Sequence, residues 1–249
     1  LLMLEDSVYD MFAYLIYIAL AILLVVTIFI APDTKGSRSW LVMGPVSLQP
    51  AEFAKLAVIV LLSFVISGRM KKITTLKQMF LVMVWILPIV GLVGTNNLST
   101  AIIIMGIAVC LIFTASPGYG HFLLLGGLGI GFLGVFLSVE SYRLERLAIW
   151  RNPEAYEKGY QTMQGLYAIG SGGLFGTGYG ASLQKLGFVP EAQNDMIFSI
   201  VCEEFGLVGA VLLIGLFLLL VWRLLMIALH VPDLSGCLLA AGIMGHILI

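Results

Sequence analysis

Asp195 is the residue of this sequence best placed to do chemistry. It ends a long polar stretch, 140–195, and stands directly before the apolar run Met196–Val201. A carboxylate beside apolar neighbours loses hydration, which can raise its pKa toward the range of a general base. An aspartate at this place can equally cap the first turn of a helix. The two interpretations are compatible, and spacing alone does not separate them.

Two adjacent acids, Glu203 and Glu204, follow one to two helical turns later. An acid at the centre of a bilayer costs roughly 2.5–3.5 kcal/mol, so the pair should be solvated or paired. We expect Glu204 to reach the membrane surface or to pair with arginines of the polar stretch. The alternative is that the acids bind a cation or a substrate.

A second charged pair is Glu52 and Lys55, whose i,i+3 spacing places both on one helix face. Because they occur within an apolar segment, both side chains should face the bundle interior and pair with each other. A structural ion pair is favoured over direct catalysis. A pair that lines a polar cavity is the alternative.

Three arginines are candidates for binding an anionic group. Arg38 lies in a short loop beside Trp40, and Arg143 and Arg146 open the long polar stretch. A guanidinium binds phosphate through two parallel hydrogen bonds, so these residues could hold lipid head groups or a diphosphate. The default role of Trp40 is that of an aromatic residue at the membrane boundary.

The polar stretch also contains two glycine-rich segments, 170–173 and 176–180, the first of which includes Ser171 and Gly172. Neither has the GxxxxGK[ST] pattern of a phosphate-binding P-loop. Glycine permits turns and close approach of the backbone, so we expect these segments to turn and to approach a ligand closely.

The composition sets the class of protein. Hydrophobic residues make up 60% of the chain and charged residues 11%, whereas soluble domains are about half apolar and a quarter charged. The chain is therefore an integral membrane protein. A net charge of −1 provides no basic surface for nucleic acid. The three cysteines lie far apart, without the spacing of a zinc site, and are expected to be small core residues.

Apolar segments of roughly 20 residues predict an all-α, polytopic helical bundle with about seven spans. The expected span 196–222 should contain a short helix up to Glu204, followed by the membrane-spanning helix proper after Gly206. The segment 78–139 has no charged residue and should break twice, at 94–97 and 116–120, where turn-forming residues cluster. The expected spans are 11–32, 49–68, 78–95, 98–115, 121–139, 196–222 and 234–249.

The distribution of cations orients these spans. The loop 69–77 carries four cations and no acid, so it should be cytoplasmic. Counting spans from this loop places the loops 140–195 and 33–48 on the extracytoplasmic side. The same count places Arg223 on the cytoplasmic side. The chain begins without Met and ends within an apolar stretch, so we expect it to be part of a longer protein, incomplete at both ends.

Several motifs together resemble those of the SEDS family of shape, elongation, division and sporulation proteins. One is the pair of segments 36–40 (GSRSW) and 49–55 (QPAEFAK). Another is 158–161 (KGYQ) followed by 168–178 (AIGSGGLFGTG). The third is 190–198 (PEAQNDMIF) followed by 203–206 (EEFG). Each motif alone is weak, but the combination is specific and extends over most of the chain.

The resemblance implies a single membrane domain over 1–249, about three helices short of the family's roughly ten, with the extracytoplasmic loop 140–195 within it. It implies a peptidoglycan glycosyltransferase of the cytoplasmic membrane that polymerises lipid II on the outer face with a class B penicillin-binding protein. It also implies dependence on a divalent cation, Mg or Mn, with no assigned ligands. The alternatives are a lipid II flippase and a scaffold without catalysis.

The same resemblance assigns roles to residues. Asp195 matches the family's required acid, which would deprotonate the 4-hydroxyl of the acceptor sugar. Arg38, Lys55, Arg143 and Arg146 would hold the diphosphate leaving group. The remaining substrate-binding candidates are Trp40, Glu52, Gln161, Ser171 and Gly172. Where many relatives have an acid, this chain has Asn97, so that position supplies no second carboxylate.

Overall fold

The computed structural model describes residues 6–32, 39–43, 46–70, 73–118, 120, 148–190 and 192–249. The chain divides into two compact units. The bundle unit comprises Leu1–Leu123 with Val221–Ile249, and the loop unit comprises Leu124–Leu220.

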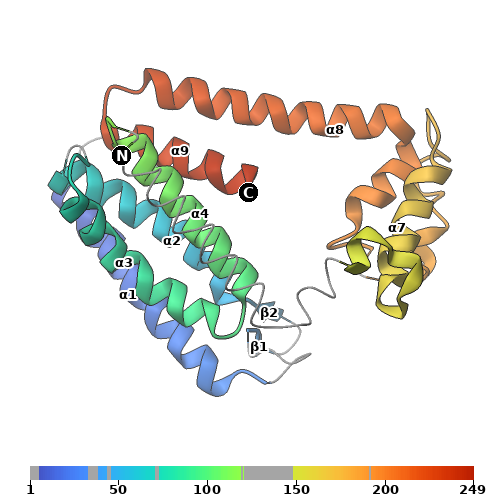
Figure 1. Ribbon diagram of the computed structural model, residues 1–249, viewed down its shortest axis with the longest axis horizontal. Coiled ribbons are helices and arrows are strands. Elements are labelled where there is room, and N and C mark those ends of the chain that lie inside the picture. Colours follow the sequence, from blue (N-terminus) through green and yellow to red (C-terminus); the bar gives the residue numbers. More distant parts are fainter. Residues whose placement is uncertain are drawn as a thin grey trace. The chain divides into compact units, whose positions relative to one another are not determined.

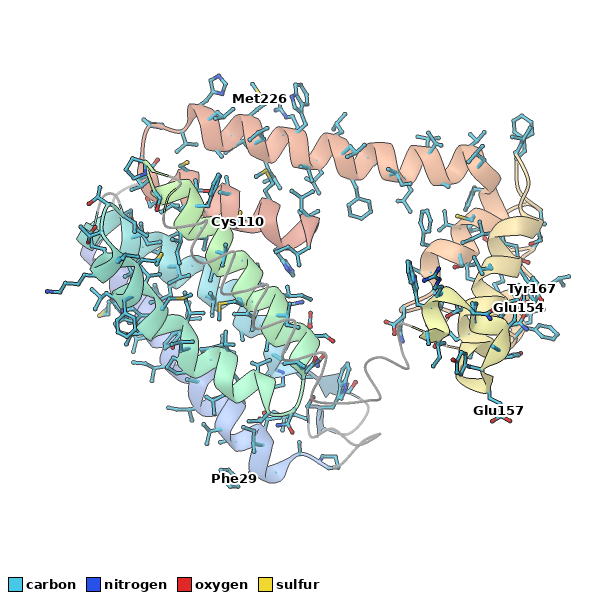
Figure 2. The ribbon with its side chains drawn as sticks, in the orientation of Figure 1. Phe29, Cys110, Glu154, Glu157, Tyr167 and Met226 are labelled. Atoms are coloured by element: carbon cyan, nitrogen blue, oxygen red, sulfur yellow. The ribbon has the colours of Figure 1, made fainter. Side chains whose placement is uncertain are left out.

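The bundle unit is built around α2 (Pro50–Val65), which continues as a π-helical turn over Ile66–Met70. Helix α2 packs against α1 (Asp6–Ile30), α3 (Leu76–Gly94), α4 (Leu98–Ala115) and α9 (Leu234–Leu248), as Figure 1 shows. Its side chains supply much of the buried core, whereas Phe29 of α1 is 78% exposed and points away from the bundle (Figure 2). An outer surface this apolar is the surface that a membrane protein presents to lipid.

Local sequence signals explain where these helices begin. Pro50 occupies the first turn of α2, where its missing N–H costs nothing. Thr75 and Gln78 form a capping box at the start of α3. The Asn97 side chain accepts a hydrogen bond of 3.1 Å from the amide of Thr100 and so caps α4. The departure from the family pattern at Asn97 therefore has a structural use.

Before α2 lies a small antiparallel hairpin that the sequence did not indicate. Strand β1 (Leu41–Met43) pairs with β2 (Val46–Leu48), with Leu41 opposite Leu48. Trp40 immediately precedes β1 and is 41% exposed.

The loop unit contains short 3-10 turns, η2 (Pro153–Ala155), η3 (Glu157–Gly159) and η4 (Gln184–Leu186), and the helix α7 (Tyr160–Ser171). The stretch 140–195, expected as one long loop, therefore contains a regular helix. Gly165 and Ala168 are the buried residues of α7.

Helix α8 (Ile197–His230) bends at Gly206, whose φ of 65° and ψ of −162° are not helical. The predicted short helix up to Glu204, followed by the span proper, is thus confirmed. The described residues include five helices long and apolar enough to cross a membrane. They confirm the expected spans except 121–139, which lies outside the described residues, and 234–249, whose helix α9 is shorter than the rest.

Candidate active site

Asp195 lies at the exposed surface of the loop unit, two residues before α8 begins at Ile197. The position directly before the helix belongs to Met196, so the alternative that Asp195 caps the helix places the cap one position too early. The burial expected from its apolar neighbours is also wrong, because the side chain is exposed. The carboxylate is therefore open to an incoming group.

Further along the chain from Asp195, α8 bends at Gly206. This bend is stabilised by the glycine loop, which we define as residues 172–180. A continuous helix would use the carbonyls of Glu203 and Glu204 to accept from amides one turn later. The bend frees these carbonyls. The amide of Thr177 donates to the Glu203 carbonyl at 2.9 Å, and that of Gly178 to the Glu204 carbonyl at 3.0 Å.

The amides on the other side of the bend are satisfied in the same way. Leu207 donates to the carbonyl of Gly173 at 2.9 Å, and Val208 donates to that of Leu174 at 3.1 Å. Four hydrogen bonds to the loop thus replace the broken helical ones. This pairing matters because an unsatisfied backbone group away from water is costly.

The glycines make this approach possible. A Cβ atom at Gly172 would collide with the carbonyl oxygen of Cys202, and one at Gly176 with that of Glu204. The expected turn is confirmed by positive φ values of 55° at Gly173 and 80° at Gly176. The close approach is to the backbone of α8, where we had expected a ligand. A role for Gly172 in binding substrate stays a prediction.

The buried side chain of Glu203 holds the segment after the glycine loop. It accepts a hydrogen bond of 2.5 Å from the Ser182 hydroxyl and one of 3.0 Å from the amide of Leu183. The hydroxyl of Ser182 in turn accepts from the amide of Lys185 at 3.2 Å. Glu203 is 3% exposed, so these donors replace the water that a carboxylate would otherwise need.

Glu204 is buried beside Glu203 and pairs with Lys185, with 2.6 Å between Nζ and Oε1. The expected pairing is confirmed, but the partner is a lysine where we had expected an arginine. Lys185 is the only cation between Lys158 and Arg223. That scarcity is the one signal for Lys185 in the sequence, and it does not identify the partner, because the two acids lie far along the chain.

Two further predicted residues lie in α7. The Gln161 side chain is half-buried and donates from Nε2 to the carbonyl of Pro190 at 3.5 Å, which ties α7 to the segment that leads to Asp195. The hydroxyl of Ser171 donates to the carbonyl of Ala168 at 2.9 Å. Both contacts are structural, and direct binding of substrate by either side chain stays a prediction.

A cavity of about 520 Å³ opens in the loop unit, lined by Lys185, Val189, Ala192, Gln193, Ile197 and Ile200. Gln193 and Ile197 flank Asp195 in the sequence. Four of the six lining residues are apolar, and Lys185 and Gln193 add a cation and an amide. The wall therefore offers both apolar and polar contacts to a ligand.

In the bundle unit, Lys55 is buried and pairs with Glu52 at 2.7 Å, which confirms the predicted ion pair. The Glu52 side chain is 51% exposed, so the expectation that both face the interior holds only for Lys55. In α9, the Nδ1 atom of His246 is buried without a hydrogen-bond partner among the described residues.

The remaining predicted residues, Arg38, Arg143 and Arg146, lie outside the described residues. Within the described part of the chain, no group of three or more His, Cys, Asp or Glu side chains could hold a metal ion. The described donors therefore do not by themselves form a metal centre.

Comparison with known proteins places this geometry in a family. The sequence matches the family described as "Cell cycle protein", which covers FtsW, RodA and SpoVE, over residues 1–249. It is 40% identical over 226 residues to "Stage V sporulation protein E" of Bacillus subtilis, which covers 86% of this chain and 60% of that protein. It is 37% identical over 227 residues to "Probable peptidoglycan glycosyltransferase FtsW" of Saccharophagus degradans, covering 89% and 59%. The chain thus spans about 60% of the length of these relatives.

Solved structures of proteins with a similar fold agree with this family assignment. The fold matches a chain of a peptidoglycan synthase complex, solved to show how polymerization and crosslinking are coordinated, with a TM-score of 0.76 and 28% identity over 98% of this chain and 69% of that one. It also matches the rod shape determining protein RodA of Thermus thermophilus, with a TM-score of 0.65 and 27% identity over 98% and 64%.

Proposed function

Because this chain belongs to the FtsW, RodA and SpoVE family of cell cycle proteins, we propose that it is the larger part of a peptidoglycan glycosyltransferase. It would polymerise lipid II in the bacterial cytoplasmic membrane, with the loop 140–195 on the outer face. The observation that carries this proposal is Asp195, an exposed carboxylate on a segment fixed to a membrane-spanning helix.

In the proposed reaction, Asp195 accepts the proton of the 4-hydroxyl of the acceptor's GlcNAc. The resulting oxygen nucleophile forms a bond to C1 of the donor's MurNAc, and the bond from C1 to the undecaprenyl diphosphate breaks. Because Glu203 and Glu204 hold the segment 182–185, Lys185 in the wall of the neighbouring cavity is fixed relative to α8, which would help to position a substrate.

The diphosphate leaving group needs positive charge. Arg38, Lys55, Arg143 and Arg146 remain our candidates, together with Trp40 and Glu52 as further contacts to substrate. A requirement for Mg or Mn also stays a prediction, which adding and removing EDTA in the assay tests directly.

The partner that we propose is a class B penicillin-binding protein, which would cross-link the glycan made here. Supporting this, a structural relative comes from a complex that couples polymerization to crosslinking. The direct test is co-purification of the full-length protein with such a partner from bacterial membranes.

The decisive experiment compares Asp195→Asn with Glu154→Gln in the full-length protein bound to its partner. Glu154 is an exposed acid of the same unit (Figure 2), so it controls for loss of charge. Losing a general base lowers the rate by about 10²–10⁴-fold, so Asp195→Asn should make almost no glycan from lipid II in detergent. Normal polymerisation by this variant would exclude Asp195 as the base.

The same assay separates the two other functions. A flippase needs a membrane to show activity, whereas a polymerase makes glycan strands in detergent. If the wild-type protein makes none in detergent but moves lipid II across vesicles, the flippase is correct. If it does neither and still binds the partner, the scaffold is correct.

A further inference from the structure

The segment after α7 exposes large apolar side chains although it is outside the apolar stretches of the sequence. We call this set the apolar loop face: Leu174 (61% exposed), Phe175 (80%), Tyr179 (87%), Leu183 (67%), Leu186 (72%) and Phe188 (54%). Large apolar residues grouped on a surface mark a site of contact with a protein or a membrane.

The two sides of this segment have opposite character. Ser182 and Lys185 turn inward to the buried acids of α8. Their neighbours Leu183 and Leu186 turn outward. In water, the reverse arrangement would be the stable one. The polar side chains of the segment thus bind the two buried acids, and its apolar side chains are left exposed, where an apolar environment would stabilise them.

At Leu174 and Tyr179, the apolar loop face adjoins the part of α8 expected to face lipid. The carbonyl of Leu174 accepts from the amide of Val208, and the ring of Tyr179 lies 6.0 Å from that of Phe205. From Leu207 onward α8 is apolar and mostly exposed. The hydrogen bonds therefore hold the loop at the level where this apolar surface begins (Figure 1).

From these observations we propose that the apolar loop face inserts into the bilayer surface beside α8. Tyr179 and Phe175 would lie at the boundary between head groups and acyl chains, where aromatic residues are enriched. The occupant is lipid because the face adjoins a membrane-spanning helix. Insertion would not require anionic lipid, because Lys185, the cation of this segment, is already paired with Glu204. The inserted loop would also shield the two acids from hydrocarbon.

The test places an environment-sensitive fluorophore on the loop of the full-length protein in phosphatidylcholine nanodiscs. Cys110, Cys202 and Cys237 are free thiols and are first replaced by alanine. Phe175→Cys is then labelled with NBD and compared with the exposed control Glu154→Cys. We expect blue-shifted emission at position 175, and at least about two-fold stronger quenching there by lipids that carry a doxyl group near the head of the acyl chain.

A second position guards against a local effect of one substitution. Leu186→Cys, which also removes an exposed side chain, should behave like Phe175→Cys. Water-like emission and control-level quenching at both positions would overturn the proposal. If the labels became protected only on adding the partner protein, the face would be a protein interface and the proposal would again be wrong. None of these readouts depends on glycosyltransfer, so the proposal and the proposed function can fail independently.

Discussion

Replacing Gly206 with alanine tests whether the bend in α8 depends on glycine. The φ of 65° and ψ of −162° lie in a region of backbone space that essentially only glycine occupies. A Cβ atom there would also collide with the amide of Gly176 and the carbonyl of Leu174. The substitution therefore strains the backbone and pushes the glycine loop away from the helix.

The size of the effect follows from two contributions. A residue in a forbidden backbone region costs of order 1–3 kcal/mol. Straightening α8 would relieve this strain but would strip the partners from four loop groups, each hydrogen bond contributing about 1 kcal/mol. The two responses therefore destabilise the protein by about 1–4 kcal/mol. For a chain of this size that lowers the unfolding midpoint by roughly 2–16 °C.

The assay is thermal unfolding of the purified protein in detergent, with Gly215→Ala as the matched control. Gly215 lies in the regular part of α8, and a Cβ atom there meets nothing within 4 Å. Alanine should therefore leave stability unchanged or raise it by up to about 1 kcal/mol. If Gly206→Ala unfolds at the same temperature as Gly215→Ala, the bend does not require glycine and our account of the loop is wrong.

Three further predictions use the same unfolding assay. Glu203→Ala should destabilise the protein by about 2–4 kcal/mol, because it leaves the buried hydroxyl of Ser182 and the part-buried amide of Leu183 without their acceptor. Glu203→Gln should cost less, and equal losses would refute the hydrogen-bonding role. Lys185→Met should cost about 1–3 kcal/mol by leaving Glu204 buried without its cation, and adding Glu204→Gln should recover part of the loss. Asp233 caps α9, and hydrogen bonds from the Ser235 hydroxyl and then the Gly236 amide hold its pKa below the usual 3.8. The contribution of the Asp233 carboxylate to the free energy of unfolding should be complete above about pH 4 and lost as pH falls through the lowered pKa. Asp233→Ala should cost about 1 kcal/mol at pH 7. A wild-type stability that does not depend on pH below about 4 would contradict this role.

The sequence predicted the helices well because each span is set by local rules. An apolar segment of fixed length, ended by Gly94–Asn97 or begun by Pro50, leaves little freedom in where a helix lies. It also predicted the break before Gly206, where a glycine follows two acids within an apolar run. Both predictions depend only on residues close together along the chain.

The arrangement around the acids could not be predicted in the same way. The partners of Glu203 and Glu204 lie about 20 residues earlier and meet them only because the glycine loop pairs with the bend. The exposure of Asp195 was missed for a related reason. Apolar neighbours in sequence bury a carboxylate only if they turn toward it, and here Ile197 and Phe198 are themselves exposed.

The acid pair and the glycine loop therefore depend on each other. Without the loop, the bend would leave four backbone groups unpaired and two carboxylates unsolvated beside a membrane span. Without the acids, the segment 182–185 would lose the groups that order it. Since Asp195 lies two residues before the same helix, a fixed bend would also help to fix the proposed base relative to the cavity next to it. A change at Gly206 or Glu203 should accordingly reduce glycan synthesis even though neither residue reaches the substrate.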